Sequence, residues 1–239
     1  MRALWGAVLD LFLPRACARC GAGVAGELAL CARCAAALRR LPHGGCRVCQ
    51  SAPRAAGDLC SACEVERGPL AEVAAEVAFD GEAAEWIRRF KYPAAGWAGL
   101  DARPVALATA LLADAARRLA EPEIGLVAPV PIHASRLRER GFHPAGELAR
   151  SLARALGVPA DPRALAQLRA TASQTGLDKR ARRRNVRGAF AVRAGLRLPR
   201  CVALVDDVVT TGATLAEAAR VLRRAGAQRV VAVCVARTL

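Results

Sequence analysis

The sequence has few aromatic residues and almost no lysine. Phe, Trp and Tyr make up 4% of its 239 residues, and of its 36 basic residues only Lys91 and Lys179 are lysines. With so few rings, we expect a core of closely packed Ala, Val and Leu. Scarce aromatics also argue against a nucleic-acid binding surface built on base stacking, because such surfaces interleave rings with basic residues.

No long uninterrupted hydrophobic run is present. The best candidate, residues 4–13, is broken by Asp10, and no small-residue cleavage site follows it. An amphipathic helix ending at Pro14 explains this stretch better than a signal peptide or a membrane span. We therefore expect a cytoplasmic protein with no transmembrane segment. In that compartment ten cysteines are better explained as metal ligands than as disulfides.

The charge is concentrated in one part of the chain. The net charge is +15, and residues 131–200 carry 16 basic and 4 acidic side chains, which gives +12. Such a field attracts polyanions, either nucleic acid or a multiply phosphorylated small molecule. No Ser-His-Asp set, cysteine nucleophile or open metal site is recognisable, so charge and phosphate binding are the main indications of function.

Eight cysteines form four evenly spaced Cys-x-x-Cys pairs. They are Cys17/Cys20, Cys31/Cys34, Cys46/Cys49 and Cys60/Cys63, and their first members are 14, 15 and 14 residues apart. Two such pairs supply the four thiolates of a tetrahedral Zn²⁺ site, so four pairs predict two structural zinc ions. Joining consecutive pairs closes short loops, although spacing alone also allows a cross-braced arrangement. Residues 1–68 are expected to form this module and to depend on zinc for folding.

Residues 69–239 have an α/β pattern. Strands are predicted over 73–79, 124–130, 201–205 and 230–235 and near Leu165, and helices over 82–90, 105–119, 144–156 and 215–224. Alternating strands and helices predict a parallel sheet with helices on both faces. Ligands bind such sheets at the carboxyl ends of the strands. Cys201 and Cys234 lie in valine-rich runs and are expected to be core residues.

The most informative stretch follows one of these strands. Two carboxylates, Asp206 and Asp207, cap the apolar run 202–205, and Thr210-Thr211-Gly212-Ala213-Thr214 leads into a helix. Loop amides and hydroxyls at a helix amino terminus cradle a phosphate, and Gly212 lets the backbone approach it. Paired carboxylates suit the two vicinal hydroxyls of a ribose and can help to position Mg²⁺ through water. Together they predict a site for a ribose 5-phosphate.

This stretch resembles the phosphoribosyl-pyrophosphate (PRPP) signature of type I phosphoribosyltransferases. With the paired cysteines ahead of it, and with Leu11-Phe12-Leu13-Pro14 before the first pair, the whole chain resembles the ComF family of competence-associated proteins. The resemblance implies a type I phosphoribosyltransferase-like domain preceded by a double zinc ribbon. Its implied chemistry is transfer of the phosphoribosyl group from Mg-PRPP to a nitrogen acceptor, with release of pyrophosphate.

The resemblance also assigns residues. Residues 127–131, followed by Arg136, Arg138 and Arg140, resemble a strand-to-loop element that receives pyrophosphate. Residues 169–174 and 182–190 resemble a long flexible loop that closes over the substrate, and Lys91-Tyr92 matches an element of uncertain role. The implied PRPP-binding residues are Asp206, Asp207, Thr210, Thr211, Gly212, Ala213, Thr214, Pro131, Arg136, Arg140, Gln174 and Arg182, with Asp206 and Asp207 also catalytic.

One segment departs from the family pattern. The family reads Arg-Gly-Phe-Asn-Gln where this chain has His143-Pro144 after Phe142. Two amide side chains that could contact pyrophosphate or the acceptor are absent, and His143 offers a titratable donor instead.

Two alternatives to the enzyme remain open at this stage. The protein could sense PRPP without turning it over. It could also be a competence accessory protein that binds single-stranded DNA and works with a helicase-like ATPase. If the arginines of both loops serve pyrophosphate, Mg-PRPP is expected to compete with DNA.

Overall fold

The fold is described by a computed structural model. It describes residues 16–17, 19–24, 30–42, 44–50, 59–92, 102–119, 123–171 and 178–239. Gln174, one of the residues that the family resemblance assigns to PRPP binding, lies outside these ranges, as do residues 4–13 and His43. Among the described helices, none is long and apolar enough to cross a membrane.

A four-stranded parallel sheet forms the centre of the molecule. It contains β1 (Glu72–Ala78), β2 (Leu126–Pro129), β5 (Cys201–Val209) and β6 (Arg229–Arg237), in the order β1-β6-β5-β2. The two inner strands are nearly continuous runs of buried apolar residues, as expected for a sheet covered on both faces. The predicted parallel α/β fold is confirmed. Cys201 and Cys234 are buried in these strands, as predicted.

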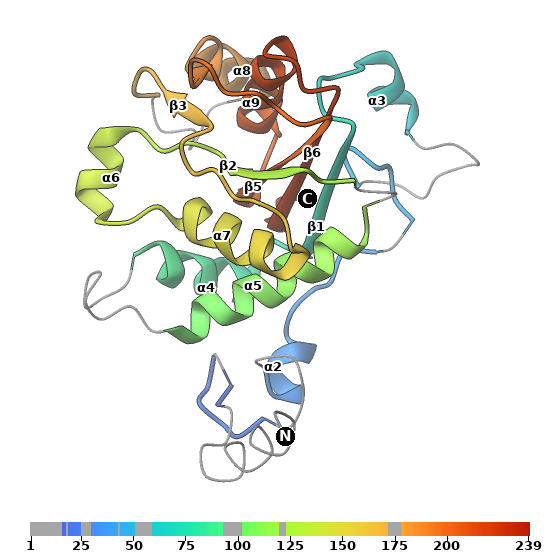
Figure 1. Cartoon of the computed structure of the whole chain (residues 1–239). Helices are drawn as coiled ribbons and strands as arrows, with labels where there is room; N and C mark the ends of the chain where they lie inside the picture. Colours follow the sequence, from blue (N-terminus) through green and yellow to red (C-terminus); the bar gives the residue numbers. More distant parts are fainter. Residues whose placement is uncertain are drawn as a thin grey trace.

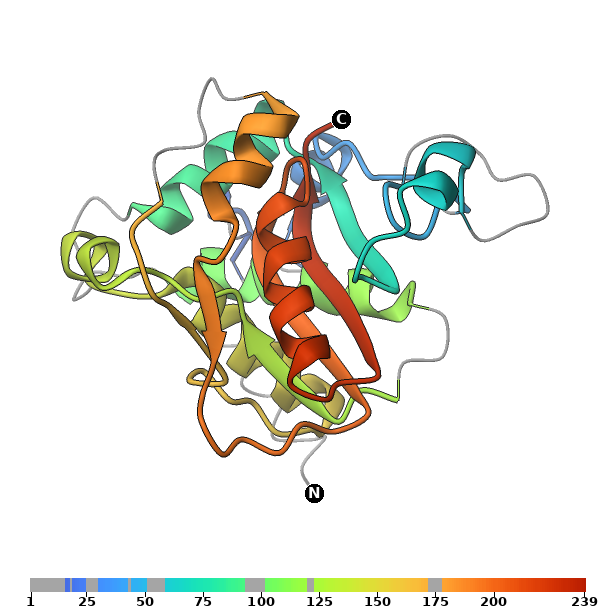
Figure 2. The same ribbon diagram turned by 90° about the horizontal axis from the view of Figure 1, so that it is seen from above.

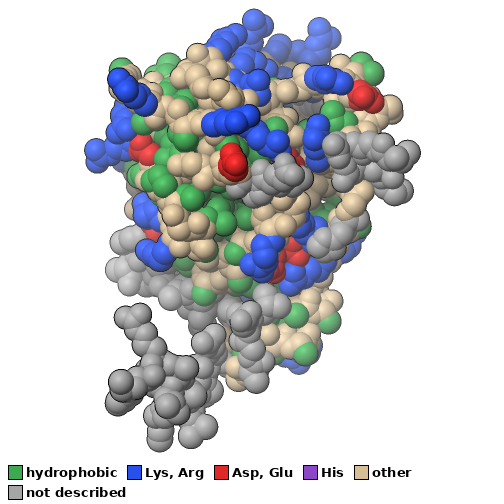
Figure 3. Space-filling view, turned by 45° about the vertical axis from the view of Figure 1, so that its right-hand side comes forward, with side chains coloured by type: hydrophobic (Ala, Val, Ile, Leu, Met, Phe, Trp, Pro, Cys, Tyr) green, Lys and Arg blue, Asp and Glu red, His purple; other side chains and the backbone are tan. Residues whose placement is uncertain are grey.

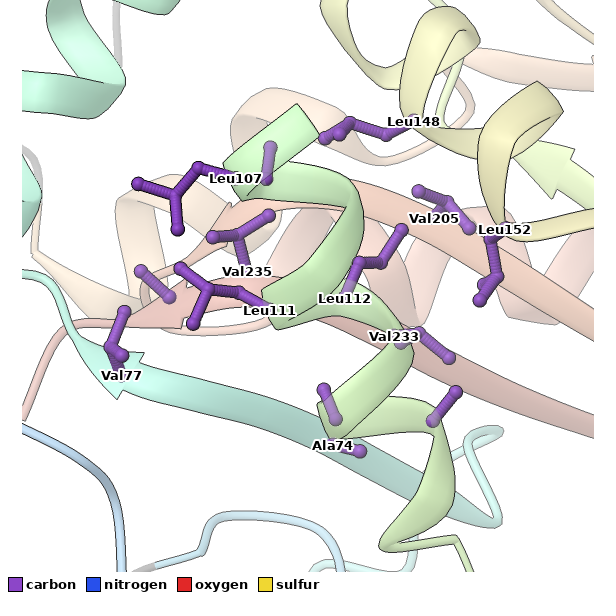
Figure 4. Packing of buried hydrophobic residues seen from close by; sticks show 14 of the residues in the cluster. Ala74, Val77, Leu107, Leu111, Leu112, Leu148, Leu152, Val205, Val233 and Val235 are labelled. Carbon is purple, nitrogen blue, oxygen red and sulfur yellow. The ribbon is translucent and has the colours of Figure 1, made fainter. Parts of the chain in front are cut away.

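Helices cover the two faces unequally. On one face lie α4 (Gly81–Lys91), α5 (Ala102–Arg117) and α7 (Pro144–Leu156), and Figure 4 shows Leu111, Leu112 and Leu152 from this layer packed against strand valines. On the other face lies α9 (Ala213–Arg224), whose leucines pack on the alternate residues of the same strands. The core is therefore aliphatic, as the scarcity of aromatics predicts.

Several elements differ from the sequence prediction. Strand β5 continues through Asp206 and Asp207 to Val209 because it stays paired with β6 over that length. The predicted strand near Leu165 is β3 (Leu165–Gln167), and it pairs antiparallel with β4 (Phe190–Val192) outside the main sheet. Two segments expected to be loops contain helices instead, namely α6 (Ala134–Arg140) and α8 (Lys179–Val186).

The cysteine-rich segment lies along the edge strand β1. Leu41 N donates to Glu76 O at 2.9 Å and Ala78 N donates to Arg39 O at 2.8 Å, while Val73 N donates to Arg47 O at 2.7 Å. These bonds occupy an edge that would otherwise be free to pair with another chain. The short helices α2 (Ala32–Ala36) and α3 (Ser61–Val65) lie well apart, on opposite sides of the sheet domain (Figure 1).

Candidate functional site

The eight paired cysteines gather into two clusters. Each cluster joins consecutive pairs, and within each the four sulfur atoms lie within 4.8 Å of one another. Cys20 Sγ and Cys31 Sγ are 3.7 Å apart, and Cys49 Sγ and Cys60 Sγ are 3.6 Å apart. Four thiolates at about 2.3 Å from one zinc ion are separated by about 3.8 Å, so the donor set and its spacing fit Zn²⁺. The sequential pairing is confirmed, and the cross-braced alternative is wrong.

The backbone of each cluster favours thiolates. Burial opposes ionisation of Cys17, but hydrogen bonds from the amides of Cys20, Cys31 and Arg19 outweigh it and lower the pKa of Cys17 to about 6. Cys46 occupies the same position in the second cluster, and its pKa is also lowered to about 6 by local amides against the effect of burial. Both first cysteines are thus prepared to bind a cation in the thiolate form.

A cavity of about 700 Å³ opens at the carboxyl ends of β5 and β2. Ten of the twelve residues assigned to PRPP binding line it: Asp206, Asp207, Thr210, Gly212, Ala213, Thr214, Pro131, Arg136, Arg140 and Arg182. Thr211 is absent from the lining, and its Oγ1 is 3.5 Å from Ala213 N within the loop. This is the position at which ligands bind open parallel sheets.

The two carboxylates in the cavity differ in their surroundings. Asp207 is buried, and its Oδ1 lies 2.8 Å from Lys91 Nζ at the end of α4. Among the residues that the structure describes, Asp206 forms no ion pair, and its Oδ1 accepts a hydrogen bond from Asp207 N at 2.9 Å. Burial, followed by the adjacent charge of Asp207, raises the pKa of Asp206 to about 7. The site therefore holds one carboxylate paired with a lysine and one, Asp206, that titrates near neutral pH.

The loop after β5 ends at the amino terminus of α9. Gly212 precedes the helix with φ 73°, a left-handed conformation that glycine adopts without strain. The helix has no side-chain cap at this end, so its first backbone N–H groups face the cavity edge together with Thr210 and Thr214. A helix amino terminus of this kind attracts an anion.

Helix α6 places its arginines selectively. Arg136 and Arg140 are four residues apart and therefore share one face, which lines the cavity, whereas Arg138 is not among the lining residues. Arg136 Nη2 donates to Thr171 O at 3.1 Å. Arg140 Nη2 donates to the Tyr92 hydroxyl at 2.9 Å, and its guanidinium lies 4.7 Å from the centre of that ring. The helical form of this segment therefore separates Arg138 from the other two arginines, and their role in binding pyrophosphate stays a prediction.

His143 also lines the cavity, but it already has a partner. Its Nε2 donates to Val130 O at 2.9 Å, and burial lowers the pKa of His143, so the ring is neutral at physiological pH. A Cβ atom at Gly146 would lie only 2.9 Å from His143 Nδ1, so the ring is packed tightly against α7. This hydrogen bond holds the start of α7 against Val130. His143 is therefore not available as the titratable donor expected from the sequence.

Five polar cavity residues received no firm role from the sequence. Lys91 and Tyr92 were matched to a family element without a role, Thr171 was matched only as part of the loop segment 169–174, and Glu139 and Gln167 were not assigned. Lys91 and Tyr92 come from the carboxyl end of α4, more than 100 residues before the acid pair. The order of strands in the sheet brings them together, and local sequence offered no signal for that contact.

Two protein-family descriptions match the chain. A double zinc ribbon domain matches residues 8–64, and a phosphoribosyl transferase domain matches residues 137–238. Competence protein F of Haemophilus influenzae is 35% identical over 148 residues, which are 60% of this chain and 63% of that protein. DNA utilization protein YhgH of Escherichia coli K12 is 42% identical over 116 residues, and its counterpart in Salmonella typhi is 41% identical over 113 residues.

The matched stretch spans about half the length of the YhgH relatives, 49% in both cases. The comparisons confirm the double zinc ribbon and the phosphoribosyltransferase domain that the sequence predicts. With them, the resemblance to the ComF family is confirmed.

Proposed function

We propose, from the ComF-type combination of a double zinc ribbon with a phosphoribosyltransferase domain, that this protein binds Mg-PRPP and transfers its phosphoribosyl group to a nitrogen acceptor. The observation that carries the proposal is the convergence in one cavity of the acid pair, the Thr-Gly loop and three arginines. The acid pair suits the ribose diol, the Thr-Gly loop suits the 5-phosphate, and the arginines suit the pyrophosphate. The two domains are proposed to divide near residue 68.

Each group has a distinct role in the proposed complex. Asp206 and Asp207 accept hydrogen bonds from the two ribose hydroxyls, and Lys91 pairs with Asp207 at 2.8 Å. Thr210, Thr214 and the first amides of α9 hold the 5-phosphate. Arg136, Arg140 and Arg182 line the part of the cavity proposed for pyrophosphate, where planar guanidinium groups can each bind two oxygens.

The carboxylates also fit a magnesium ion. The raised pKa of Asp206 reflects its burial and, after that, the charge of Asp207 beside it, and a cation relieves that repulsion. Asp206 and Asp207 would hold Mg²⁺ through water, as Mg²⁺ keeps much of its hydration shell. When bound, Mg²⁺ offsets the negative charge of pyrophosphate.

The transfer itself needs positioning and charge stabilisation more than a strong base. The bond from the anomeric carbon to pyrophosphate breaks, the bond to nitrogen forms, and negative charge grows on the leaving pyrophosphate. Arg136, Arg140 and Arg182 stabilise that charge, and their contribution is greater where water is excluded. Tyr92 holds Arg140 in place for this role through its hydroxyl and its ring face.

Pyrophosphate release distinguishes transfer from sensing. Zinc-loaded protein is incubated with Mg-PRPP and a panel of nucleobases and amines, with Asp206→Asn/Asp207→Asn as the control. Release that needs one acceptor and both carboxylates supports the transferase. Tight PRPP binding without release for any acceptor supports the sensor, and absence of PRPP binding refutes the site. The names of the relatives, competence protein F and DNA utilization protein, further support a place in DNA uptake. We also propose that the protein acts in the cytoplasm beside a helicase-like ATPase.

A further inference from the structure

A second hollow lies on the other side of α8, next to the cavity proposed for PRPP. Its volume is about 1100 Å³, and it is bounded by the end of α3, by α8 and by α9. Eight arginines and two carboxylates line it, and no lining residue among those described is aromatic. We call it the arginine groove. Figure 3 shows Lys and Arg side chains gathered along the upper part of the molecule, where Figure 1 places these helices.

The arginines of α8 follow the period of the helix. Arg180, Arg183, Arg184 and Arg187 occupy positions i, i+3, i+4 and i+7, and all four are exposed and line the groove. Arg182 lies on another face and lines the cavity proposed for PRPP. One helix therefore carries two separate sets of arginines. In Figure 2, α8 and α9 lie next to each other above the sheet.

Helix α9 presents a matching row. Arg220, Arg223 and Arg224 are again spaced by three and four residues, are exposed, and line the same groove. Arg67, just after α3, closes one end. Two rows of like charge that face each other repel, so this arrangement is unfavourable without an anion between them.

Few of these charges are neutralised within the protein. Arg183 pairs with Glu66 at 2.6 Å, Arg67 with Glu64 at 3.8 Å, and Arg220 with Glu217. Within the part of the chain that the structure describes, Arg180, Arg184, Arg187, Arg223 and Arg224 form no ion pair. Five of the eight groove arginines therefore face the groove without a carboxylate partner among the described residues.

We infer that the arginine groove binds the phosphate backbone of a single-stranded nucleic acid. The arginine rows of α8 and α9 line the two sides of one groove, so a single phosphate backbone that lies along it can contact both rows. Guanidinium groups bind phosphates through paired hydrogen bonds. An acidic polypeptide fits less well, because protein partners are usually anchored by aromatic or large apolar residues and the groove offers little for these to enter.

The groove and the cavity proposed for PRPP adjoin but differ. Val186 and Ala213 line both hollows, whereas the arginines divide between them. PRPP and a bound strand can therefore occupy the protein together. The expected competition between PRPP and DNA is replaced by independent binding, with α8 as the shared element. This inference does not depend on whether PRPP is turned over.

The test titrates a labelled 20-nucleotide oligo-dT with full-length, zinc-loaded protein at several salt concentrations. Arg184→Gln/Arg223→Gln/Arg224→Gln is compared with Arg154→Gln/Arg163→Gln/Arg197→Gln, which removes three exposed arginines outside the groove. We expect the groove variant to bind at least tenfold more weakly, with a salt slope smaller by about 2, because each phosphate contact on a single strand contributes about 0.7. The control should bind like wild type.

Three outcomes overturn the inference. Equal loss in both variants means that net charge alone attracts DNA. Displacement of the oligonucleotide by saturating Mg-PRPP means that the two ligands share the cavity proposed for PRPP. Equally tight binding of polyglutamate of the same charge means that the groove serves an acidic protein. Circular dichroism and zinc content of both variants distinguish lost binding from lost folding, and Arg180→Gln/Arg187→Gln provides a second test on α8 alone.

Discussion

The two hollows on either side of α8 both contain arginines, but only one contains groups for a specific small molecule. The cavity proposed for PRPP combines Arg136, Arg140 and Arg182 with the acid pair and the Thr-Gly loop. The arginine groove has rows of arginine with two carboxylates and no counterpart of the acid pair. Arginine supplies attraction in both, while the neighbouring groups decide whether one phosphorylated sugar or an extended backbone is recognised. Composition does not distinguish these cases, but position does.

Loss of the second zinc cluster, formed by Cys46, Cys49, Cys60 and Cys63, should produce the largest difference in ligand binding between the two hollows. Helix α3 begins directly after the ligand Cys60 and contains the ligand Cys63, so Cys60→Ser/Cys63→Ser removes one wall of the groove. We expect oligonucleotide binding to fall at least tenfold, with one zinc ion left per chain. Zinc analysis and fluorescence anisotropy measure the two effects.

The matched control is Cys31→Ser/Cys34→Ser, which removes the same number of ligands from the first cluster. That cluster packs near α4, where Arg19 pairs with Glu82. Equal loss of oligonucleotide binding in both variants would show that α3 does not define the groove.

Asp206 should destabilise the free protein above neutral pH. Its pKa is raised from 3.8 to about 7 in the folded state, so the stability it contributes is present below pH 3.8 and is lost as pH rises through 7. Three pKa units correspond to about 4 kcal/mol, and partial access of solvent reduces this to about 2 kcal/mol. Asp206→Asn should therefore raise the free energy of unfolding, and by more at pH 8.5 than at pH 6. Urea unfolding of both proteins at the two pH values measures this gain. An equal gain in unfolding free energy at pH 6 and pH 8.5 contradicts the raised pKa of Asp206.

Two neighbouring arginines of α8 should have opposite effects. Arg182→Gln is expected to weaken Mg-PRPP binding about tenfold and leave oligonucleotide binding unchanged, because Arg182 faces the cavity proposed for PRPP. Arg184→Gln should do the reverse, although less strongly, since several arginines share the groove. Calorimetry with PRPP and anisotropy with oligo-dT give both affinities for both variants. If both variants lose PRPP affinity and oligonucleotide affinity to the same extent, the two faces of α8 do not bind different ligands.

Helices with strong apolar periodicity were predictable from the sequence, whereas helices made mostly of charged residues were missed. Helix α7 was predicted at its observed bounds because Pro144 starts it and buried leucines recur along it. Helix α8 is almost entirely polar, so no hydrophobic pattern marks it. A signal was nevertheless present, because Asp178 Oδ1 accepts a hydrogen bond from Ala181 N at 2.6 Å as an amino-terminal cap.

Much of the candidate site was predictable because it is contiguous. The acid pair and the Thr-Gly loop lie within nine residues, from Asp206 to Thr214. The pairing of Lys91 with Asp207, and the division of the arginines between two hollows, depend on helix faces and strand order instead. Such contacts join distant parts of the chain and leave no local pattern.

Titration calorimetry of Mg-PRPP binding tests the central claim most directly. Wild-type protein should bind Mg-PRPP, and Asp206→Asn/Asp207→Asn should bind it more weakly by about 2–5 kcal/mol while the fold stays intact, because charge-assisted hydrogen bonds to the ribose are lost. An unchanged affinity in the folded double variant would contradict the assignment of the cavity as the PRPP site.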